Sequence, residues 1–205
     1  MIRLARDGAV WTLTLDRPDK ANSLTREMLV QLRDAAAEAE QADIAAMILT
    51  GTGRVFSAGA DLDAARAGLA TDGIWEDLSG RIARLPCLTV AALNGTLAGG
   101  AFGMALACDL RLAVPGAKFF YPVMQLGFLP QPSDPARLAA LVGPARAKMI
   151  LMAAQKIDAE TARDWGLVDR IVEADALLTA ARALTDAPAA APGHVRRAIK
   201  RMIPH

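Results

Sequence analysis

NGTLAGGAFGMALACD (Asn94–Asp109) places two glycines, Gly99 and Gly100, between an apolar run and a row of small, helix-compatible residues. A second glycine-centred turn lies upstream in Val55–Leu62, which reads VFSAGADL. Each turn follows a strand-like apolar run, so both predict a loop that connects a strand to a helix. Two such loops can aim backbone N–H groups at one point, which is an arrangement that stabilises a developing oxyanion.

The composition indicates one large domain with a substantial buried core. The chain has 205 residues, of which 53% are hydrophobic and 22% are charged, a balance typical of globular proteins. Lys and Arg number 23 against 22 Asp and Glu, a net charge of +1, so no overall field attracts nucleic acid or an anionic membrane. The alternating, charged N-terminus is unlike a signal peptide, and no apolar stretch reaches about 18 residues. We therefore expect a soluble cytoplasmic protein that contacts neither a membrane nor nucleic acid.

Strand and helix patterns alternate along the chain, which predicts an α/β fold with a parallel sheet. A hairpin turn at 6–8 precedes the alternating strand VWTLTL. The proline- and alanine-rich stretch 187–193 is interpreted as a linker or turn, and Cys87 and Cys108, both in apolar runs, as buried free thiols. Strands are expected at 10–15, 45–50, 88–93, 110–114 and 118–121, and helices at 27–42, 74–84, 135–142, 144–153, 158–164, 173–186 and 194–203.

Five segments, taken in order, resemble the crotonase family, the enoyl-CoA hydratase/isomerase superfamily. One such motif alone is weak evidence, whereas five in the correct order make coincidence improbable. The segments are LDRPDKANSLT (15–25), ILTGTGRVFSAGADL (48–62), VAALNGTLAGGAFGMALACDLRLAV (90–114), AKFFYPVMQLGFLP (117–130) and KIDAETARDWGLVDRIV (156–172).

The resemblance implies a crotonase-like spiral of ββα units in residues 1–143 and a shortened C-terminal helical region in residues 144–205. It also implies a homo-oligomer, a trimer in this family, although the short C-terminus puts the usual oligomer contacts in doubt. The substrate would be an acyl-CoA thioester, so coenzyme A enters as part of the substrate and no separate cofactor is expected.

The resemblance also implies the site residues. The backbone N–H groups of Ala60 and Gly100 would polarise the thioester carbonyl, and coenzyme A would meet Ala58, Ala60, Asp61 and Leu62. Taken alone, Gly99-Gly100 is typical of a tight turn without a ligand, but the paired context favours the oxyanion interpretation. For Asp61, an N-cap of the following helix is favoured over a catalytic acid.

The two glutamates that handle water and the α-proton in hydratases of this family are absent. By register the first falls on Gly103, three residues after Gly100, and the second falls on Val123, directly after Pro122. Neither residue can accept a proton, so the two-glutamate hydration mechanism does not carry over. Decarboxylases of the family resemble this chain in having valine after the proline, and their chemistry needs an enolate but no base.

Three weaker candidates lie downstream. Asp134 is the nearest acid, but it precedes Pro135 at the start of a predicted helix, so an N-cap is favoured for it at this stage. Gln131 and Tyr121 can orient a water or a carboxylate, and Tyr121 is equally plausible as core or pocket wall. No His, Cys and Asp cluster has the spacing of a metal site.

Two further features have two interpretations each. His194 and His205 are the only histidines, and a solvated role is favoured over catalysis. The basic run 196–201 can meet coenzyme A phosphates, although a solvated helix face is the commoner explanation.

The sequence therefore predicts an enoyl-CoA hydratase/isomerase family protein in which isomerase or decarboxylase-like chemistry is favoured over hydration. The alternative is a non-catalytic acyl-CoA-binding member of the family.

Overall fold

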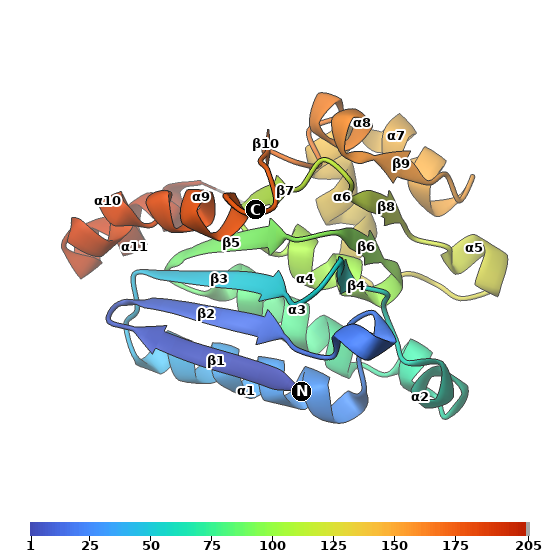
Figure 1. The fold of residues 1–205 in the computed structure, drawn as a ribbon, viewed down its shortest axis with the longest axis horizontal. Coiled ribbons are helices and arrows are strands. Elements are labelled where there is room, and N and C mark those ends of the chain that lie inside the picture. Colours follow the sequence, from blue (N-terminus) through green and yellow to red (C-terminus); the bar gives the residue numbers. More distant parts are fainter. Residues whose placement is uncertain (204–205) are drawn as a thin grey trace.

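The chain forms two sheets whose strands alternate along the middle of the sequence (Figure 1). The computed structural model describes residues 1–203. Within them, the larger sheet has the order β1 (Ile2–Asp7), β2 (Val10–Leu15), β3 (Ala46–Gly51), β5 (Leu88–Leu93), β7 (Leu110–Ala113) and β10 (Arg170–Ile171). The smaller sheet has the order β4 (Val55–Ser57), β6 (Thr96–Ala98), β8 (Lys118–Phe120) and β9 (Ile157–Asp158).

The larger sheet begins with an antiparallel hairpin and continues in parallel. β1 and β2 pair antiparallel around the predicted turn, where Gly8 has a φ of +56°. In β2 the apolar residues Trp11, Leu13 and Leu15 are buried, as the alternation predicts for a strand with one covered face. From β2 onward, each neighbouring pair of strands in this sheet is parallel.

Successive strands pass from the larger sheet to the smaller one. β3 is followed by β4, β5 by β6 and β7 by β8, and each pair leads into helices before the next strand of the larger sheet begins. This repeated step is a spiral of ββα units. The predicted α/β fold with a crotonase-like spiral is therefore confirmed, and the loops that leave β4 and β6 come from consecutive units.

The helices of successive units cover one face of the larger sheet, where α1, α3 and α4 lie in a row behind the strands in Figure 1. Thr25 caps α1 by accepting a hydrogen bond from the Met28 N–H at 3.3 Å. The helices are α1 (Arg26–Gln41), α2 (Leu62–Arg66), α3 (Ile74–Arg84), α4 (Phe102–Leu106), α5 (Val123–Leu126), α6 (Asp134–Val142), α7 (Pro144–Leu151), α8 (Ala159–Asp164), α9 (Leu177–Ala183), α10 (Asp186–Ala190) and α11 (Gly193–Met202).

The structure differs from the sequence-based prediction mainly in the C-terminal region. The stretch 187–193 is not a linker, because α10 occupies Asp186–Ala190, and alanine favours helix there. β9 and β10, which also lie beyond residue 143, pair with β8 and β7 at the edges of the two sheets. The division at residue 143 stays a prediction, and its last two residues, 204 and 205, lie outside the described part of the chain. Cys87 and Cys108 are buried free thiols, as predicted.

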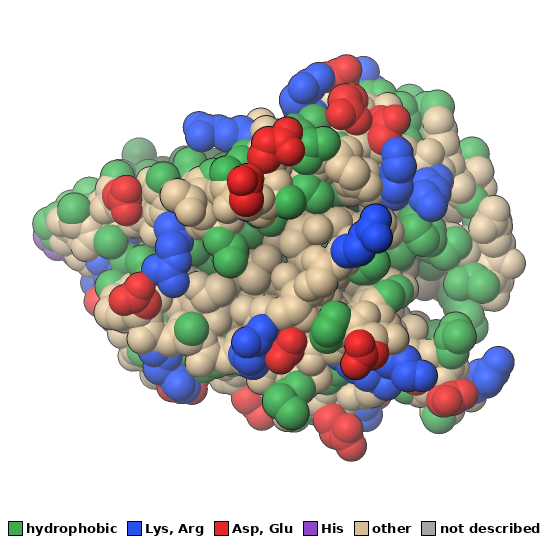
Figure 2. All heavy atoms as spheres, in the orientation of Figure 1, with side chains coloured by type: hydrophobic (Ala, Val, Ile, Leu, Met, Phe, Trp, Pro, Cys, Tyr) green, Lys and Arg blue, Asp and Glu red, His purple; other side chains and the backbone are tan. Residues whose placement is uncertain are grey.

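Figure 2 shows acidic and basic side chains interspersed on one face of the molecule, in agreement with the net charge of +1. Apolar atoms gather at the end of the molecule where α5 lies in Figure 1. This apolar end includes Leu126, Phe128 and Leu129, which are all exposed.

Candidate active site

The two glycine loops lie against each other where β4 and β6 end. These strands are parallel, and Ser57 stands opposite Leu97. The residues two positions further along, Gly59 and Gly99, are therefore neighbours, and a Cβ added to Gly99 would stand 3.6 Å from the Gly59 Cα. Their φ angles are +90° and +57°, a conformation that glycine adopts without steric cost. The two turns noted in the sequence thus come together in space.

Each loop offers a backbone N–H group near this contact. The Leu24 N–H donates to the Gly59 carbonyl and the Asp61 N–H donates to the Leu24 carbonyl, both at 2.8 Å. This parallel bridge turns the N–H of the intervening Ala60 away from Leu24. The Gly100 nitrogen lies 3.4 Å from the position of a Cβ on Gly59. Outside the helices and strands of residues 1–203, neither the Ala60 nor the Gly100 N–H donates a hydrogen bond to another backbone group.

The Trp75 ring of α3 lies behind the second glycine loop. A Cβ added to Gly100 would stand 3.3 Å from this ring, and the Trp75 indole N–H donates to the Leu69 carbonyl at 2.8 Å. Both Trp75 and Leu69 are buried. The indole is therefore fixed and supports the turn that presents the Gly100 N–H. Trp75 was not among the residues singled out from the sequence, where it is only one apolar position of the helix at 74–84.

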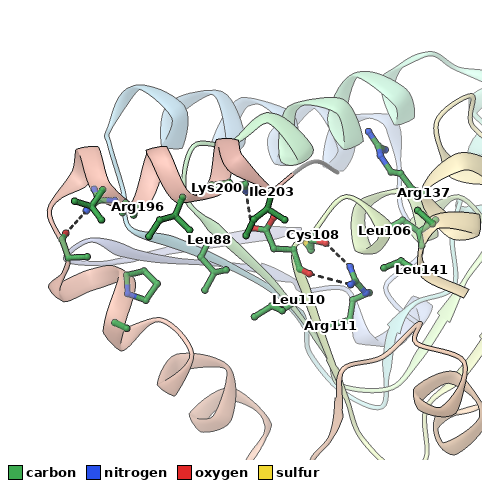
Figure 3. A pocket seen from close by; sticks show the side chains of 17 residues that line it. Leu88, Leu106, Cys108, Leu110, Arg111, Arg137, Leu141, Arg196, Lys200 and Ile203 are labelled. Atoms are coloured by element: carbon green, nitrogen blue, oxygen red, sulfur yellow. Dashed lines mark hydrogen bonds and ion pairs between the residues drawn. The ribbon is translucent and has the colours of Figure 1, made fainter.

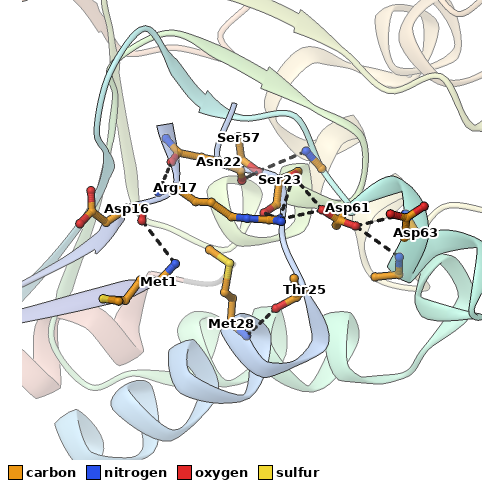
Figure 4. Close-up of polar contacts among 12 residues, drawn as sticks. Met1, Asp16, Arg17, Asn22, Ser23, Thr25, Met28, Ser57, Asp61 and Asp63 are labelled. Carbon is orange, nitrogen blue, oxygen red and sulfur yellow. Dashed lines mark hydrogen bonds and ion pairs between the residues drawn. The ribbon is translucent and has the colours of Figure 1, made fainter. Parts of the chain in front are cut away.

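Buried polar side chains hold the first glycine loop (Figure 4). The Asn22 amide donates to the carbonyls of Thr52 and Val55, at 2.9 and 2.7 Å. Ser57 Oγ donates to the Asn22 carbonyl at 2.9 Å and accepts from the Gly59 N–H at 3.2 Å. Both Asn22 and Ser57 are fully buried. These contacts fix the path of the backbone into Gly59, and no sequence pattern assigned them that role.

Asp61 caps α2, as favoured from the sequence. Its Oδ1 accepts from the N–H groups of Asp63 and Ala64 at 3.1 and 3.4 Å, and its Oδ2 pairs with Arg17 at 2.7 Å (Figure 4). The Arg17 guanidinium, followed by the helix N–H groups, holds the pKa of Asp61 below its usual range. Its carboxylate is thus engaged in the fold. The neighbouring Leu62 is exposed, and so is Ala58 on the other side of the turn.

The space beside Gly103 is occupied by the carboxyl group of Asp134. A Cβ added to Gly103 would stand 3.0 Å from Asp134 Oδ1 and 3.4 Å from Oδ2. Gly103 lies in α4 and Asp134 is the first residue of α6, so the packing of these two helices brings them together. An acid is therefore adjacent to the first vacant glutamate position, although it comes from another helix. Val123, at the second vacant position, is buried at the start of α5.

Asp134 is not the N-cap that we favoured from the sequence. Ser133 occupies the cap position, and the Asp134 carboxyl turns inward and is fully buried. Glu76 of α3 serves the helix end instead, because it accepts hydrogen bonds from both the N–H (3.2 Å) and the hydroxyl of Ser133. The capping prediction is wrong because the glycine at 103 leaves room inside the fold for the carboxyl group.

Tyr121 and Gln131 meet Asp134 as a buried group. The Tyr121 hydroxyl donates to Asp134 Oδ2 at 2.9 Å and accepts from the Gln131 backbone N–H at 3.4 Å. The Tyr121 ring stacks on Phe102 with ring centroids 5.3 Å apart. All three candidates are thus brought together, with Gln131 taking part through its backbone. Among residues 1–203, Asp134 Oδ1 has no hydrogen-bond partner.

Burial dominates the electrostatics of this group. It raises the pKa of Asp134 to about 7, against the lowering effects of the Tyr121 hydrogen bond and of Arg137. The Tyr121 pKa is raised as well, first by burial and then by the neighbouring Asp134. A carboxyl with a pKa near 7 exchanges its proton readily at neutral pH, which is the property of an acid–base catalyst. Structural ion-pair networks also shift pKa values, so the shift alone assigns no role.

A cavity of about 670 Å³ lies elsewhere, between α11 and the strands β5 and β7 (Figure 3). Its lining is mainly apolar, and Lys200 at its edge donates to the Cys87 carbonyl at 2.6 Å and pairs with Asp109 at 2.8 Å. Arg196 and Arg197 of the same helix both pair with Asp43. Most of the basic run thus attaches α11 to the body of the protein, a role that differs from both predicted ones.

Other kinds of site find little support in the described part of the chain. No group of three or more His, Cys, Asp and Glu side chains in residues 1–203 is arranged to hold a metal ion. Within the same residues, no helix has the length and apolar character that crossing a membrane requires. His194 is exposed in α11, as predicted, whereas His205 lies outside the described residues.

Known proteins resemble the chain along most of its length. The profile of the enoyl-CoA hydratase/isomerase family matches residues 5–204. A probable enoyl-CoA hydratase of Mycobacterium bovis is 36% identical over 186 residues, covering 89% of this chain and 72% of the relative. The 1,2-epoxyphenylacetyl-CoA isomerase of Escherichia coli is 33% identical, covering 93% and 78%. The crystal structure of a Bacillus anthracis enoyl-CoA hydratase superposes with a TM-score of 0.91 at 29% identity, covering 98% of this chain and 81% of that one.

These matches agree with the ββα spiral and with the two glycine loops in contact. The resemblance predicted from five short segments therefore extends over nearly the whole chain. The chain belongs to the enoyl-CoA hydratase/isomerase family.

Proposed function

We propose that this protein is an enzyme that acts on acyl-CoA thioesters through an enolate, whose oxygen accepts hydrogen bonds from the Ala60 and Gly100 N–H groups. The observation that carries the proposal is the contact between the two glycine loops, which places the Gly100 nitrogen 3.4 Å from the position of a Cβ on Gly59. Loss of the α-proton or of a carboxylate next to a thioester carbonyl builds negative charge on oxygen. Preorganised N–H donors stabilise that charge, and one donor is worth about 3–4 kcal/mol.

Isomerisation or decarboxylation is favoured over hydration. Hydration needs one group that activates water and one that delivers a proton, and Gly103 and Val123 supply neither. An isomerase needs a single acid–base group and a decarboxylase needs no base. The E. coli relative, which is named an isomerase, supports an assignment on this side of the family, while the mycobacterial relative is named a probable hydratase.

Coenzyme A is proposed to enter as part of the substrate, with no separate cofactor. Its contacts are assigned to the turn of Ala58, Ala60, Asp61 and Leu62. The exposure of Ala58 and Leu62 supports this assignment, since surface residues on a rigid loop are available to a ligand. Because its carboxylate serves as a helix cap, Asp61 would take part through its backbone.

The test is a panel of 2-enoyl-, 3-enoyl-, 3-ketoacyl- and malonyl-CoA thioesters, with products followed by mass spectrometry and binding by calorimetry. Gly100→Pro removes the N–H donor, and Gly100→Ala is its matched control, since it keeps the donor but adds the Cβ that meets Trp75 at 3.3 Å. We expect Gly100→Pro to lose roughly 100- to 1,000-fold in turnover, and Gly100→Ala to lose much less. Equal turnover in the wild type and a folded Gly100→Pro variant would refute the oxyanion assignment.

The second candidate is a non-catalytic member of the family that binds acyl-CoA. The absence of both glutamates favours it. Measurable thioester binding with no turnover of any thioester in the panel would select it. The expected homo-oligomer is a separate prediction, which light scattering of the purified protein tests directly.

A further inference from the structure

Asp134 brings a carboxyl group to α4 at the turn that follows the Gly100 donor. Gly100 and Gly103 are three residues apart, so they lie on one face about one helical turn, roughly 5 Å, apart. Asp134 Oδ1 stands 3.0 Å from the position of a Cβ on Gly103. The carboxyl therefore lies against the place where a side chain from residue 103 would begin.

Only one of the two oxygens of the Asp134 carboxyl has a hydrogen-bond partner among residues 1–203. The Tyr121 hydroxyl holds Oδ2 at 2.9 Å, while Oδ1 is buried without a hydrogen-bond partner in residues 1–203. A buried carboxylate oxygen left without a partner costs free energy. Such a group requires an explanation, and acid–base chemistry on a bound substrate is one, because the substrate supplies the missing partner.

The groups packed around Asp134 restrict it to one arrangement. Glu76 of α3 accepts two hydrogen bonds from Ser133 and so anchors the first turn of α6. Arg137, one turn further along α6, donates to Ser79 Oγ at 3.0 Å, and the Ser79 Cβ would meet a Cβ on Gly103 at 3.5 Å. The charged neighbours of the carboxyl, Glu76 and Arg137, are thus both held by other partners.

We propose that Asp134 is the acid–base residue of this site and that it moves a proton between two carbons of a 3-enoyl-CoA thioester. This assignment rests on the proposed function. Oδ1 takes the α-proton, the C–H electron pair forms a dienolate whose oxygen is held by Ala60 and Gly100, and the protonated carboxyl then returns the proton to the γ-carbon. The double bond moves from the 3- to the 2-position, and the carboxylate is regenerated.

Burial of the unliganded carboxyl fits this role. An acyl chain seated against Gly103 would bring its C–H groups to Asp134 Oδ1, and neither Gly103 nor Val123 supplies a second acid that could activate a water for addition to a double bond. Glycine at 103 leaves this space to the carboxyl, because a Cβ there would stand only 3.0 Å from Oδ1. Tyr121 is a positioning residue that acts through Asp134.

The experiment measures deuterium incorporation at the α-carbon of butanoyl-CoA in D₂O by mass spectrometry, together with butanoyl-CoA binding by calorimetry. Butanoyl-CoA has no double bond, so exchange reports the base and the oxyanion donors alone. The variants are Asp134→Asn, which keeps the size and an acceptor for Tyr121, and Asp175→Asn, a matched control at an exposed position. We expect Asp134→Asn to lose at least roughly 100-fold in exchange with binding kept within threefold, and Asp175→Asn to match the wild type.

Each other outcome is decisive. Exchange at the wild-type rate in Asp134→Asn, or binding without exchange in the wild type, would overturn the assignment of Asp134 and leave acyl-CoA binding intact. Absence of binding by the wild type would instead refute the proposed function, and the assignment with it. If Asp134→Asn fails to fold, the wild-type pH profile replaces it: exchange that rises with pH and reaches a plateau supports a carboxylate base, and exchange that does not depend on pH between 5 and 9 overturns it.

Discussion

The Tyr121 hydroxyl donates a 2.9 Å hydrogen bond to Oδ2 of Asp134, and both side chains are buried. The bond links the end of β8 to the start of α6, and it stabilises the ionised form of the carboxyl. Removal of this one hydroxyl therefore changes the proton affinity of Asp134 with little change in packing.

Tyr121→Phe is expected to raise the pKa of Asp134 above its wild-type value of about 7, because the lost hydrogen bond is one that lowers it. Less carboxylate is then present at neutral pH, and the rising limb of the exchange rate against pH moves to higher pH. The ring remains stacked on Phe102, but Asp134 Oδ2 and the Gln131 N–H lose their partner, so we expect the free energy of unfolding to fall by about 1–3 kcal/mol. If the rise of the exchange rate with pH occurs at the same pH in the variant and the wild type, the hydroxyl does not change the pKa of Asp134.

Asp134→Asn is expected to stabilise the protein above pH 7. The native pKa of about 7 lies above the unfolded value of about 3.9, so the native state binds more protons than the unfolded state between these values. Wild-type stability is therefore fully present below pH 4 and falls as pH rises to 7, by up to about 4 kcal/mol. Asparagine does not titrate, so its variant avoids the loss. Urea unfolding at pH 4 and pH 8 measures the difference, and an equal effect at both values would contradict the prediction.

The effects of Gly103→Glu and Asp134→Gly on the free energy of unfolding are expected to depend strongly on each other. The glutamate alone brings its Cβ within 3.0 Å of Asp134 Oδ1, which costs about 1–3 kcal/mol as overpacking and like-charge contact. Asp134→Gly removes the obstacle, so the double variant should regain part of the lost stability. A double-mutant cycle by urea unfolding should yield a coupling energy above about 1 kcal/mol. Additive effects would mean that the two positions do not share one space.

Asp61→Ala is expected to cost about 1–2 kcal/mol at pH 7, because it removes the cap of α2 and the partner of Arg17. The native pKa of Asp61 is lowered, so its contribution is present above the unfolded value of about 3.9 and is lost as pH falls below it. Asp63→Ala is the control, since its side chain is 91% exposed and pairs only with Arg66. Comparable losses in both variants would contradict the capping role.

Much of the fold follows from apolar periodicity, whereas the short elements do not. The strands VWTLTL and LTVAAL and the helix at 74–84 agree with the structure in their bounds. β4 and β6 were not predicted, because three residues are too few to show an alternation. The α10 helix was missed because a proline and a short alanine run are equally typical of a linker.

The candidate site was predictable from the sequence only where backbone groups would form it. The glycine turns identify the loops that hold Ala60 and Gly100. The position of Asp134 depends instead on the packing of α6 against α4, which no local pattern encodes, and its place before Pro135 favoured a cap. Likewise Glu76 was simply a polar residue of a helix, because its partner Ser133 is 57 residues away in the sequence.

The parallel pairing of β4 and β6, with Ser57 opposite Leu97, has a consequence for how such a site can change over time. Both proposed donors are peptide groups whose spacing comes from two neighbouring turns of the spiral, so most point mutations leave them in place. The proton-handling group is a side chain, and it can be lost from one helix and regained from another. A fold built this way can exchange its reaction while it keeps its means of activating a thioester.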